Sequence, residues 1–413
     1  MIKRILYTLL IMFPVVASAQ INTDRVMAIG RNALYFEDYV LSIQYFNQVI
    51  NAKPYLSDPY FYRGLAKINL DDFQGAESDC SEAIERNPFV VSAYQVRGLA
   101  RIQQNNFAGA IEDYTKALEF DPENIGVWHN MALCRIRQED YKGAKNDLDK
   151  LIAISPRYTK AYLMRGEVDL KQKDTLAAEK DFGKAIEIDR YDSDTWASRA
   201  ILRLQQQRYK DAEADFDHAI RLSTRNSGVY INRALARYHQ NNLRGAMSDY
   251  DIALDIDPNN FIGHYNRGLL RAQVGDDNRA IQDFNFVIEM EPDNMMAIFN
   301  RGLLLDQTGD YKGAIKDYST VINEYPNFLL GYQYRAQARR KIGDVKGADA
   351  DEFKVLKAQL DKQNGVDPNK QTADNTENNK TRKKSDKNMN NYRKIVVADN
   401  EEGEEKYKSD YRG

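Results

Sequence analysis

The sequence contains few of the residues on which disulfide-linked, collagen-like and nucleic-acid-binding proteins depend. Its 413 residues include two cysteines, ten prolines and 23 glycines. Two cysteines exclude a disulfide scaffold and a cysteine-built zinc site, and the low proline and glycine counts exclude a collagen-like chain. The 58 basic and 61 acidic side chains give a net charge of −3. Because no basic excess is available to hold a phosphate backbone, the composition disfavours a dedicated nucleic-acid-binding protein.

Patterns typical of enzymes and metal sites are missing as well. The sequence holds no zinc-protease, nucleophile-elbow, dinucleotide-binding, phosphate-loop or EF-hand spacing. Its four histidines are scattered along the chain: His129, His218, His239 and His264. Cys80 and Cys134 are interpreted as buried free thiols. We therefore expect a protein that is not an enzyme, with no catalytic residue, no metal site and no cofactor.

One apolar run stands out, and it lies at the N-terminus. Lys3 and Arg4 precede the run Ile5–Ala17, which leads into an Ala-Ser-Ala site ending at Ala19. This order predicts a signal peptide over residues 1–19, and the 13-residue run is shorter than the roughly 17–25 residues that cross a bilayer. An uncleaved anchor is the alternative, which Pro14 opposes. We expect an exported protein of the periplasm or cell envelope, with secretion also open and no membrane span after cleavage.

The rest of the chain repeats with a period of 34 residues. Alanines recur at this interval without an insertion: Ala76, Ala110, Ala144, Ala178, Ala212, Ala246, Ala280, Ala314 and Ala348. Aspartates recur three residues after each alanine: Asp79, Asp113, Asp147, Asp181, Asp215, Asp249, Asp283, Asp317 and Asp351. Nine coincidences at two offsets exclude chance, so the chain is predicted to be an array of equal structural repeats.

Within one repeat the apolar spacing is helical. Apolar and small residues mark two faces on either side of a polar turn at Asp71-Asp72: Tyr60, Gly64, Leu65 and Ile68, then Phe73, Ala76, Cys80, Ala83 and Ile84. The small residues Gly64 and Ala76 allow two antiparallel helices to approach closely. Because neither helix can bury its apolar face alone, neighbouring helix pairs must stack on one another.

These residues resemble the tetratricopeptide repeat family. Its pattern of an aromatic, a small residue, Tyr or Phe, Ala and Pro within 34 residues is met by Trp128, Ala132, Tyr141, Ala144 and Pro156. The resemblance covers ten repeats over residues 23–362. It implies an all-α fold, a right-handed α-solenoid of about ten helix-turn-helix units within residues 20–362. The period stops after residue 362, and residues 363–413 are predicted to form a low-complexity, disordered tail.

A row of arginines lies sixteen residues before the row of aspartates. Its members in the later repeats pair as Arg233 with Asp249, Arg267 with Asp283, and Arg301 with Asp317. An anion-binding stripe is one interpretation. A ladder of arginine–carboxylate bridges within and between repeats is favoured, because each arginine row has a matching aspartate row.

The resemblance also suggests where a partner binds. In the family, the first helix of each pair lines a concave groove, and fixed positions of the repeat point into it. At these positions the chain has Asn232, Asn266 and Asn300, with Asn130 as an outlier. Beside them lie apolar residues: Ile231, Tyr265 and Phe299, then Leu235, Leu269 and Leu303.

An amide row beside an apolar strip can bind the backbone of an extended peptide. The alternative is that the asparagines cap or bridge within the groove wall and that the leucines belong to the core. The lysine-rich clamp that other family members use for C-terminal carboxylates is absent, because no repeat has lysine at its fifth position.

In the tail, one apolar island spans residues 392–398, with sequence YRKIVVA. It could pair with a partner as a strand or dock in a groove, and a plain disordered tail is the alternative. For the whole chain we expect a non-catalytic scaffold that binds a protein or an extended peptide. The alternative function is a permanent accessory subunit of an outer-membrane or secretion assembly complex.

Overall fold

The protein is an array of helix pairs. The computed structural model describes residues 22–223, 225–363 and 389, and within these ranges it contains twenty helices and no strand. The predicted all-α array of ten helix pairs is therefore confirmed. The predicted signal peptide and tail, apart from Gln363 and Met389, lie outside the described residues. In the described ranges, no helix is both long and apolar enough to cross a bilayer.

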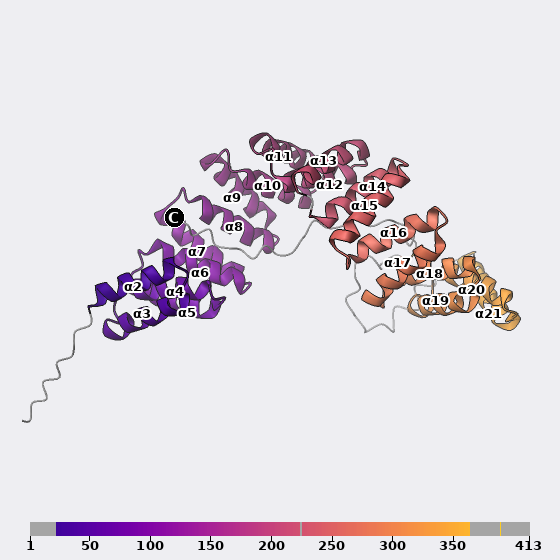
Figure 1. Ribbon diagram of the computed structural model, residues 1–413, viewed down its shortest axis with the longest axis horizontal. Helices are drawn as coiled ribbons and strands as arrows, with labels where there is room; N and C mark the ends of the chain where they lie inside the picture. The colour runs from indigo at the N-terminus through magenta and orange to yellow at the C-terminus, as the bar shows by residue number, and fades with distance from the viewer. Residues whose placement is uncertain (1–21, 224, 364–388, 390–413) are drawn as a thin grey trace, which may run out of the picture. The chain divides into compact units, whose positions relative to one another are not determined.

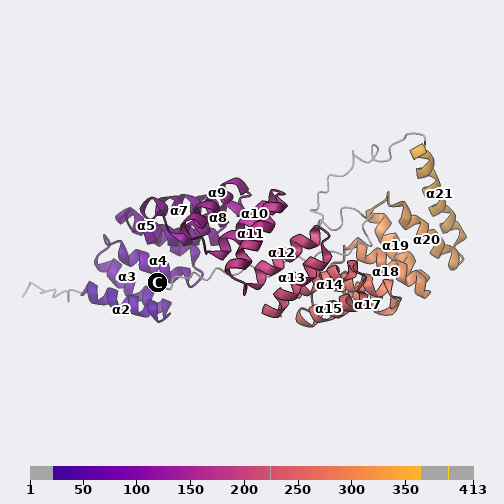
Figure 2. The same ribbon diagram turned by 90° about the horizontal axis from the view of Figure 1, so that it is seen from above.

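Each pair consists of a first and a second helix that lie side by side (Figure 1, Figure 2). The first helices are α2 (Thr23–Tyr35), α4 (Asp58–Ile68), α6 (Val91–Gln103), α8 (Ile125–Arg137), α10 (Thr159–Lys171), α12 (Ser193–Gln205), α14 (Ser227–His239), α16 (Phe261–Gln273), α18 (Met295–Thr308) and α20 (Leu329–Lys341). The second helices are α3 (Tyr39–Ala52), α5 (Phe73–Arg86), α7 (Phe107–Phe120), α9 (Tyr141–Ile154), α11 (Thr175–Ile188), α13 (Tyr209–Leu222), α15 (Leu243–Ile256), α17 (Asp277–Met290), α19 (Tyr311–Glu324) and α21 (Val345–Gln363).

The chain divides into two compact units, Met1–Ile188 and Asp189–Gly413. The N-terminal unit contains the pairs from α2 to α11, and the C-terminal unit contains the pairs from α12 to α21. Within each unit, a second helix packs against the first helix of the next pair, as α13 does against α14. Stacking therefore buries the faces that a single pair would leave exposed.

The turn inside each pair has the same backbone conformation. One residue per repeat has a positive φ, and these residues are 34 apart: Glu37, Asp71, Asn105, Glu139, Lys173, Gln207, Asn241, Gly275, Gly309 and Gly343. In most pairs the next residue is an aspartate or asparagine that caps the second helix, as Asp72 does by accepting a hydrogen bond from the Gly75 N–H. The polar turn predicted from the sequence therefore reverses the chain and caps the helix that follows.

Close packing inside a pair depends on a small residue opposite a large one. A Cβ atom added to Gly98 of α6 would lie 2.8 Å from the ring of Tyr114 in α7. Tyr114 is fully buried, as are Phe182, Phe216 and Phe284 at the same position of later repeats. The small residues of the pattern thus make room for one large side chain per pair.

An aromatic residue near the start of many first helices holds the loop before it. Its polar tip faces a backbone carbonyl six residues earlier, in the pairs Tyr60–Pro54, Trp128–Pro122, Tyr162–Pro156, Trp196–Arg190 and His264–Pro258. This contact explains why the position favours tyrosine, tryptophan and histidine, which carry a donor. His264 also has its Nδ1 atom 3.0 Å from an oxygen of Asp283.

In most repeats an arginine of the first helix joins three helices. Arg233 of α14 donates two hydrogen bonds to Asp249 of α15, from Nε at 3.0 Å and from Nη2 at 2.6 Å. Its Nη1 atom donates to Asp217 of the preceding helix α13 at 2.7 Å. Arg267 makes the same contacts to Asp283 and Asp251. We call this three-helix contact the arginine clamp.

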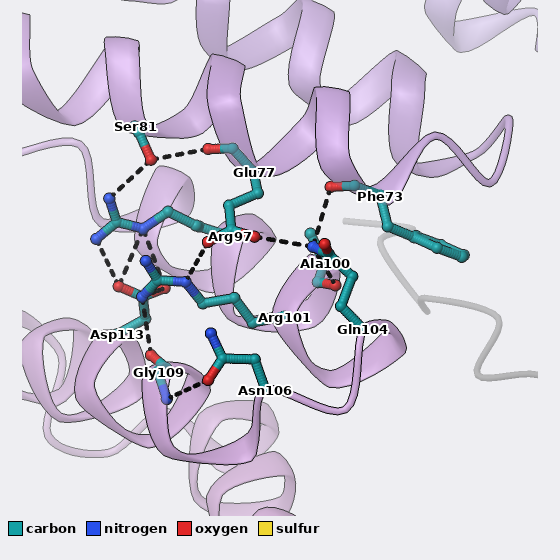
Figure 3. A network of polar contacts seen from close by, with 10 residues as sticks. All are labelled: Phe73, Glu77, Ser81, Arg97, Ala100, Arg101, Gln104, Asn106, Gly109 and Asp113. Atoms are coloured by element: carbon teal, nitrogen blue, oxygen red, sulfur yellow. Dashed lines mark hydrogen bonds and ion pairs between the residues drawn. The ribbon is translucent and has the colours of Figure 1, made fainter.

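Figure 3 shows the clamp of an earlier repeat with the residues around it. Arg97 binds Asp113 and reaches Ser81 of the preceding second helix, while Arg101, one turn further along α6, donates to Asp113 and Glu77. Arg301 repeats the contact in the C-terminal unit, with Asp317 and Asn285 as its acceptors. The acceptor on the preceding helix is thus carboxylate, amide or hydroxyl, whereas the partner inside the pair is always aspartate.

The clamp aspartates are almost completely buried, with 1% exposure at Asp249 and 2% at Asp283. Burial raises the pKa of Asp249, and the hydrogen bonds and charges of Arg233 and Arg237 oppose that rise. Burial acts on Asp283 too, but the hydrogen bonds from His264 and Arg267 outweigh it, so the pKa of Asp283 is lowered. Each carboxylate therefore depends on its arginine partners for the charge it carries inside the protein.

We predict that Arg233→Ala weakens α14 and α15 by about 3 kcal/mol, because it leaves the buried carboxylate of Asp249 without its main partner. Hydrogen exchange of the amides in these two helices measures the local free energy of opening. Arg340→Ala is the matched control, since Arg340 pairs with Glu352 on the surface. Equal losses in the two variants would contradict a structural role for the clamp.

We predict that Tyr250→Phe stabilises the protein by about 1 kcal/mol. Tyr250 is fully buried, and its hydroxyl oxygen has no hydrogen-bond partner among the described residues. The chain itself places phenylalanine at this position in Phe216 and Phe284. Thermal unfolding followed by circular dichroism should give a higher midpoint for the variant, and a lower midpoint would show that the hydroxyl is satisfied.

Candidate functional site

The candidate site is one side of the first helices in the C-terminal unit. Helix α14 is flanked by α13, α15 and α12, and α18 is flanked by α17, α19, α16 and α20. The residues that the family resemblance predicts for the groove lie on one side of these first helices. We call this side of α14, α16 and α18 the first-helix face, defined by these residues: Gly228, Ile231, Asn232, Leu235, Ile262, Tyr265, Asn266, Leu269, Met296, Phe299, Asn300 and Leu303.

Helical repetition places three of the predicted asparagines at equivalent points. Asn232, Asn266 and Asn300 occupy the sixth position of three successive repeats, on α14, α16 and α18. Asn130 occupies the same position on α8, in the N-terminal unit, and does not join the other three. The row predicted from the sequence therefore contains three members, all within one unit.

The first-helix face carries no charged residue, so its chemistry is that of amides and apolar groups. Asn300 donates a hydrogen bond from Nδ2 to the Met296 carbonyl at 2.8 Å and faces the Tyr265 hydroxyl at 3.4 Å. The Phe299 ring lies edge-on to Phe328 at 5.0 Å. A face of this kind suits an uncharged, extended segment whose backbone meets amides and whose side chains meet apolar groups.

The face is buried in this structure. Ile231, Asn232, Asn266 and Phe299 have no exposed surface, and Leu235, Tyr265 and Asn300 are at most 5% exposed. Leu269 and Leu303 are partly buried and pack against the core cluster of the C-terminal unit. The predicted anchors are thus covered, and Tyr265 and Phe299 also pack against Phe284 of α17 and Tyr318 of α19.

Burial at these positions differs between repeats, and Val96 of α6 at the position of Asn300 is also fully buried. At the position of Asn300, Tyr62, Asn130, Met164 and Tyr334 in other repeats are only partly buried. At the position of Phe299, Gln333 is exposed. In α18, by contrast, each residue from Met295 to Asn300 is buried, which means that the helix is enclosed on all sides.

One described residue outside the helices belongs to this covered region. Met389 is 5% exposed and joins the hydrophobic cluster that includes Tyr265, Met295, Met296 and Phe299. The sequence interpretation missed Met389, because it focused on the apolar island at residues 392–398. The available signal was a single methionine within the polar stretch DKNMNN, three residues before that island.

The titratable groups outside the clamps do not assemble a reactive site in the described part of the chain. Burial lowers the pKa of His129 to about 4, and burial raises the pKa values of the free thiols Cys80 and Cys134 to about 12. Such thiols are poor nucleophiles at neutral pH. No group of three or more histidine, cysteine, aspartate or glutamate residues lies close enough to hold a metal ion within the described ranges.

Comparison with known protein families finds matches to the tetratricopeptide repeat over much of the chain. Models of the tetratricopeptide repeat match residues 125–158, 159–192, 198–261 and 265–327, and a model described as TPR repeat matches residues 98–134. No curated protein matches the chain.

Three solved structures illustrate the similarity. A tetratricopeptide repeat protein from Parabacteroides merdae is 21% identical, with 60% of this chain and 98% of that chain covered and a TM-score of 0.47. The C-terminal part of a TPR repeat-containing protein from Cytophaga hutchinsonii is 17% identical, with 58% and 98% covered and a TM-score of 0.49. YrrB, a TPR protein with an unusual peptide-binding site, is 20% identical, with 45% and 95% covered and a TM-score of 0.37. With its helix pairs, its 34-residue period and these family matches, the chain belongs to the tetratricopeptide repeat family.

Proposed function

We propose that this protein is a non-catalytic scaffold that binds extended segments of partner proteins on the first-helix face of its C-terminal unit. The observation that carries the proposal is the row Asn232, Asn266 and Asn300 on three successive first helices, with apolar side chains on both sides. Each amide can donate one hydrogen bond and accept another, which matches the alternating groups of an extended backbone. The uncharged surroundings favour a partner segment of apolar and amide residues over an acidic or basic one.

The proposal assigns the scaffold to the periplasm or cell envelope. This location rests on the signal-peptide pattern of residues 1–19, which has two basic residues, a short apolar run and an Ala-Ser-Ala site. An alternative is a permanent accessory subunit of an envelope or secretion complex. That alternative draws support from exposed aromatic residues away from the face, such as Phe89 and Phe120, whose rings meet edge-on at 6.0 Å.

We predict that replacing Asn232, Asn266 and Asn300 together by alanine weakens partner binding at least tenfold. Loss of three hydrogen-bonding amides removes about 1 kcal/mol or more each from the complex. Partners are first recovered with the intact protein from cells, and their affinities for both proteins are then measured by calorimetry. Asn130→Ala is the matched control, because Asn130 occupies the same repeat position in the other unit.

Circular dichroism must show that the triple variant keeps its helical content and thermal midpoint. Unchanged affinity in a folded triple variant would contradict binding at the first-helix face. Deletion of the residues after Leu360 distinguishes the scaffold from the permanent subunit. A permanent subunit would be released from its complex by this deletion, whereas a scaffold would still bind its partner.

We predict that the mature protein begins at Gln20. The Ala-Ser-Ala sequence that precedes Gln20 is the kind of site cut by signal peptidase. Mass spectrometry of the protein purified from its own cells gives the mass of the N-terminal peptide. Recovery of a peptide that begins at Met1 would contradict export by a cleaved signal.

A further inference from the structure

We propose that the segment of this chain containing Met389 occupies the first-helix face of α16 and α18, so that the protein carries its own ligand. This proposal rests on the function proposed above, because a partner segment that binds the same face would compete with the Met389 segment. The protein would then bind a partner only by displacing this segment.

The first line of evidence is the burial of Met389 itself. Met389 is 5% exposed, although it lies 26 positions after Gln363, the last residue of α21. It shares a hydrophobic cluster with Tyr265 of α16 and with Met295 and Phe299 of α18. Methionine suits such a contact, because its unbranched side chain adapts to irregular apolar surfaces and its sulfur packs well against aromatic rings.

The second line of evidence is the burial of the face. Tyr265 and Asn266 of α16 and Met296, Phe299 and Asn300 of α18 are at most 5% exposed, and Tyr265, Met296 and Phe299 belong to the cluster that Met389 joins. Met295, Met296 and Ile298 at the start of α18 are 4–8% exposed, and the start of α14 is buried to the same degree, with Ser227, Val229 and Tyr230 4–6% exposed. The face of α16 and α18 is therefore buried together with Met389, as expected if the segment that contains Met389 lies on it.

The covalent connection permits this placement. Residues 364–388 can span at most about 90 Å when fully extended. Successive packed helices lie about 8–10 Å apart, so the distance from the end of α21 back to α16 is well within that reach. Because the ligand belongs to the same chain, its effective concentration is of millimolar order, and even a weak contact keeps the face occupied.

The sequence around Met389 indicates what a competing partner must offer. Asn388, Asn390 and Asn391 flank Met389, which matches a face of asparagines and apolar side chains without charge. A partner that displaces the segment should therefore present a methionine or leucine between short amide or other uncharged polar residues. Acidic or basic partner segments would meet no complementary charge on the face.

The test uses the full-length chain and a fluorescent peptide with the sequence of residues 386–398. Met389→Asp places a charge on the chain's own ligand, so we expect the peptide to bind this variant at least tenfold more tightly than it binds the unaltered protein. Met389→Leu should bind the peptide as weakly as the unaltered protein does. Lys384→Asp, outside the segment, controls for the added negative charge and should also leave binding weak.

Two further measurements locate the contact. Adding Asn266→Ala and Asn300→Ala to the Met389→Asp chain should weaken peptide binding at least tenfold, whereas adding Asn130→Ala should not. A photoreactive benzoylphenylalanine at position 389 should cross-link to α16 or α18 of the same chain. Cross-links to the N-terminal unit or to a second copy would overturn the proposal.

The outcomes separate this proposal from the proposed function. Equal peptide affinity for the unaltered chain and the Met389→Asp chain, or no binding to either, would overturn self-occupation of the face. The capture of partners and its loss in the triple asparagine variant would then still stand. If the peptide result holds while the triple variant retains its partners, the segment binds the face but external partners bind elsewhere.

Discussion

The arginine clamp is the interaction on which the array depends. Each clamp arginine reaches from a first helix to the second helix of its own pair and, through another nitrogen, to the second helix of the preceding pair. Without its arginine partner, a buried aspartate such as Asp249 could carry its charge only at a high cost in free energy. The bidentate geometry fixes both the distance and the orientation of the three helices. A constant 34-residue interval follows, because any insertion would move an arginine away from its acceptors.

The clamp and the close packing of small against large residues use only some sides of each first helix. Several residues of the first-helix face belong to the hydrophobic core clusters, yet the residue at its asparagine position varies from repeat to repeat. In this chain the row changes from Tyr62 and Asn130 in the N-terminal unit to three successive asparagines in the C-terminal unit. A uniform framework thus supports one local face with its own chemistry.

A face made of amides and apolar groups is difficult to leave open to water. Unsatisfied buried amides are costly, and an exposed apolar strip invites unwanted association. Met389 in the cluster of α16 and α18 offers a physical solution, since a segment of the same chain can cover the strip until a better ligand arrives. Selectivity would then come from the need to outcompete a tethered ligand, which favours partners with several well-matched contacts.

The sequence by itself determined the helix pairs, their polar turns and the arginine and aspartate rows, because each of these rests on contacts between residues at most a repeat or so apart. Spacing of 34 residues and the pairing of Arg233 with Asp249 can be read from such local regularity. The tertiary structure decided that Asn232, Asn266 and Asn300 are buried while Asn130 is only partly so, and that Met389 joins a cluster with Phe299. Burial of this kind depends on which segments meet in space, and Met389, 90 positions after Phe299, belongs to no repeat, so it leaves no periodic pattern in the sequence.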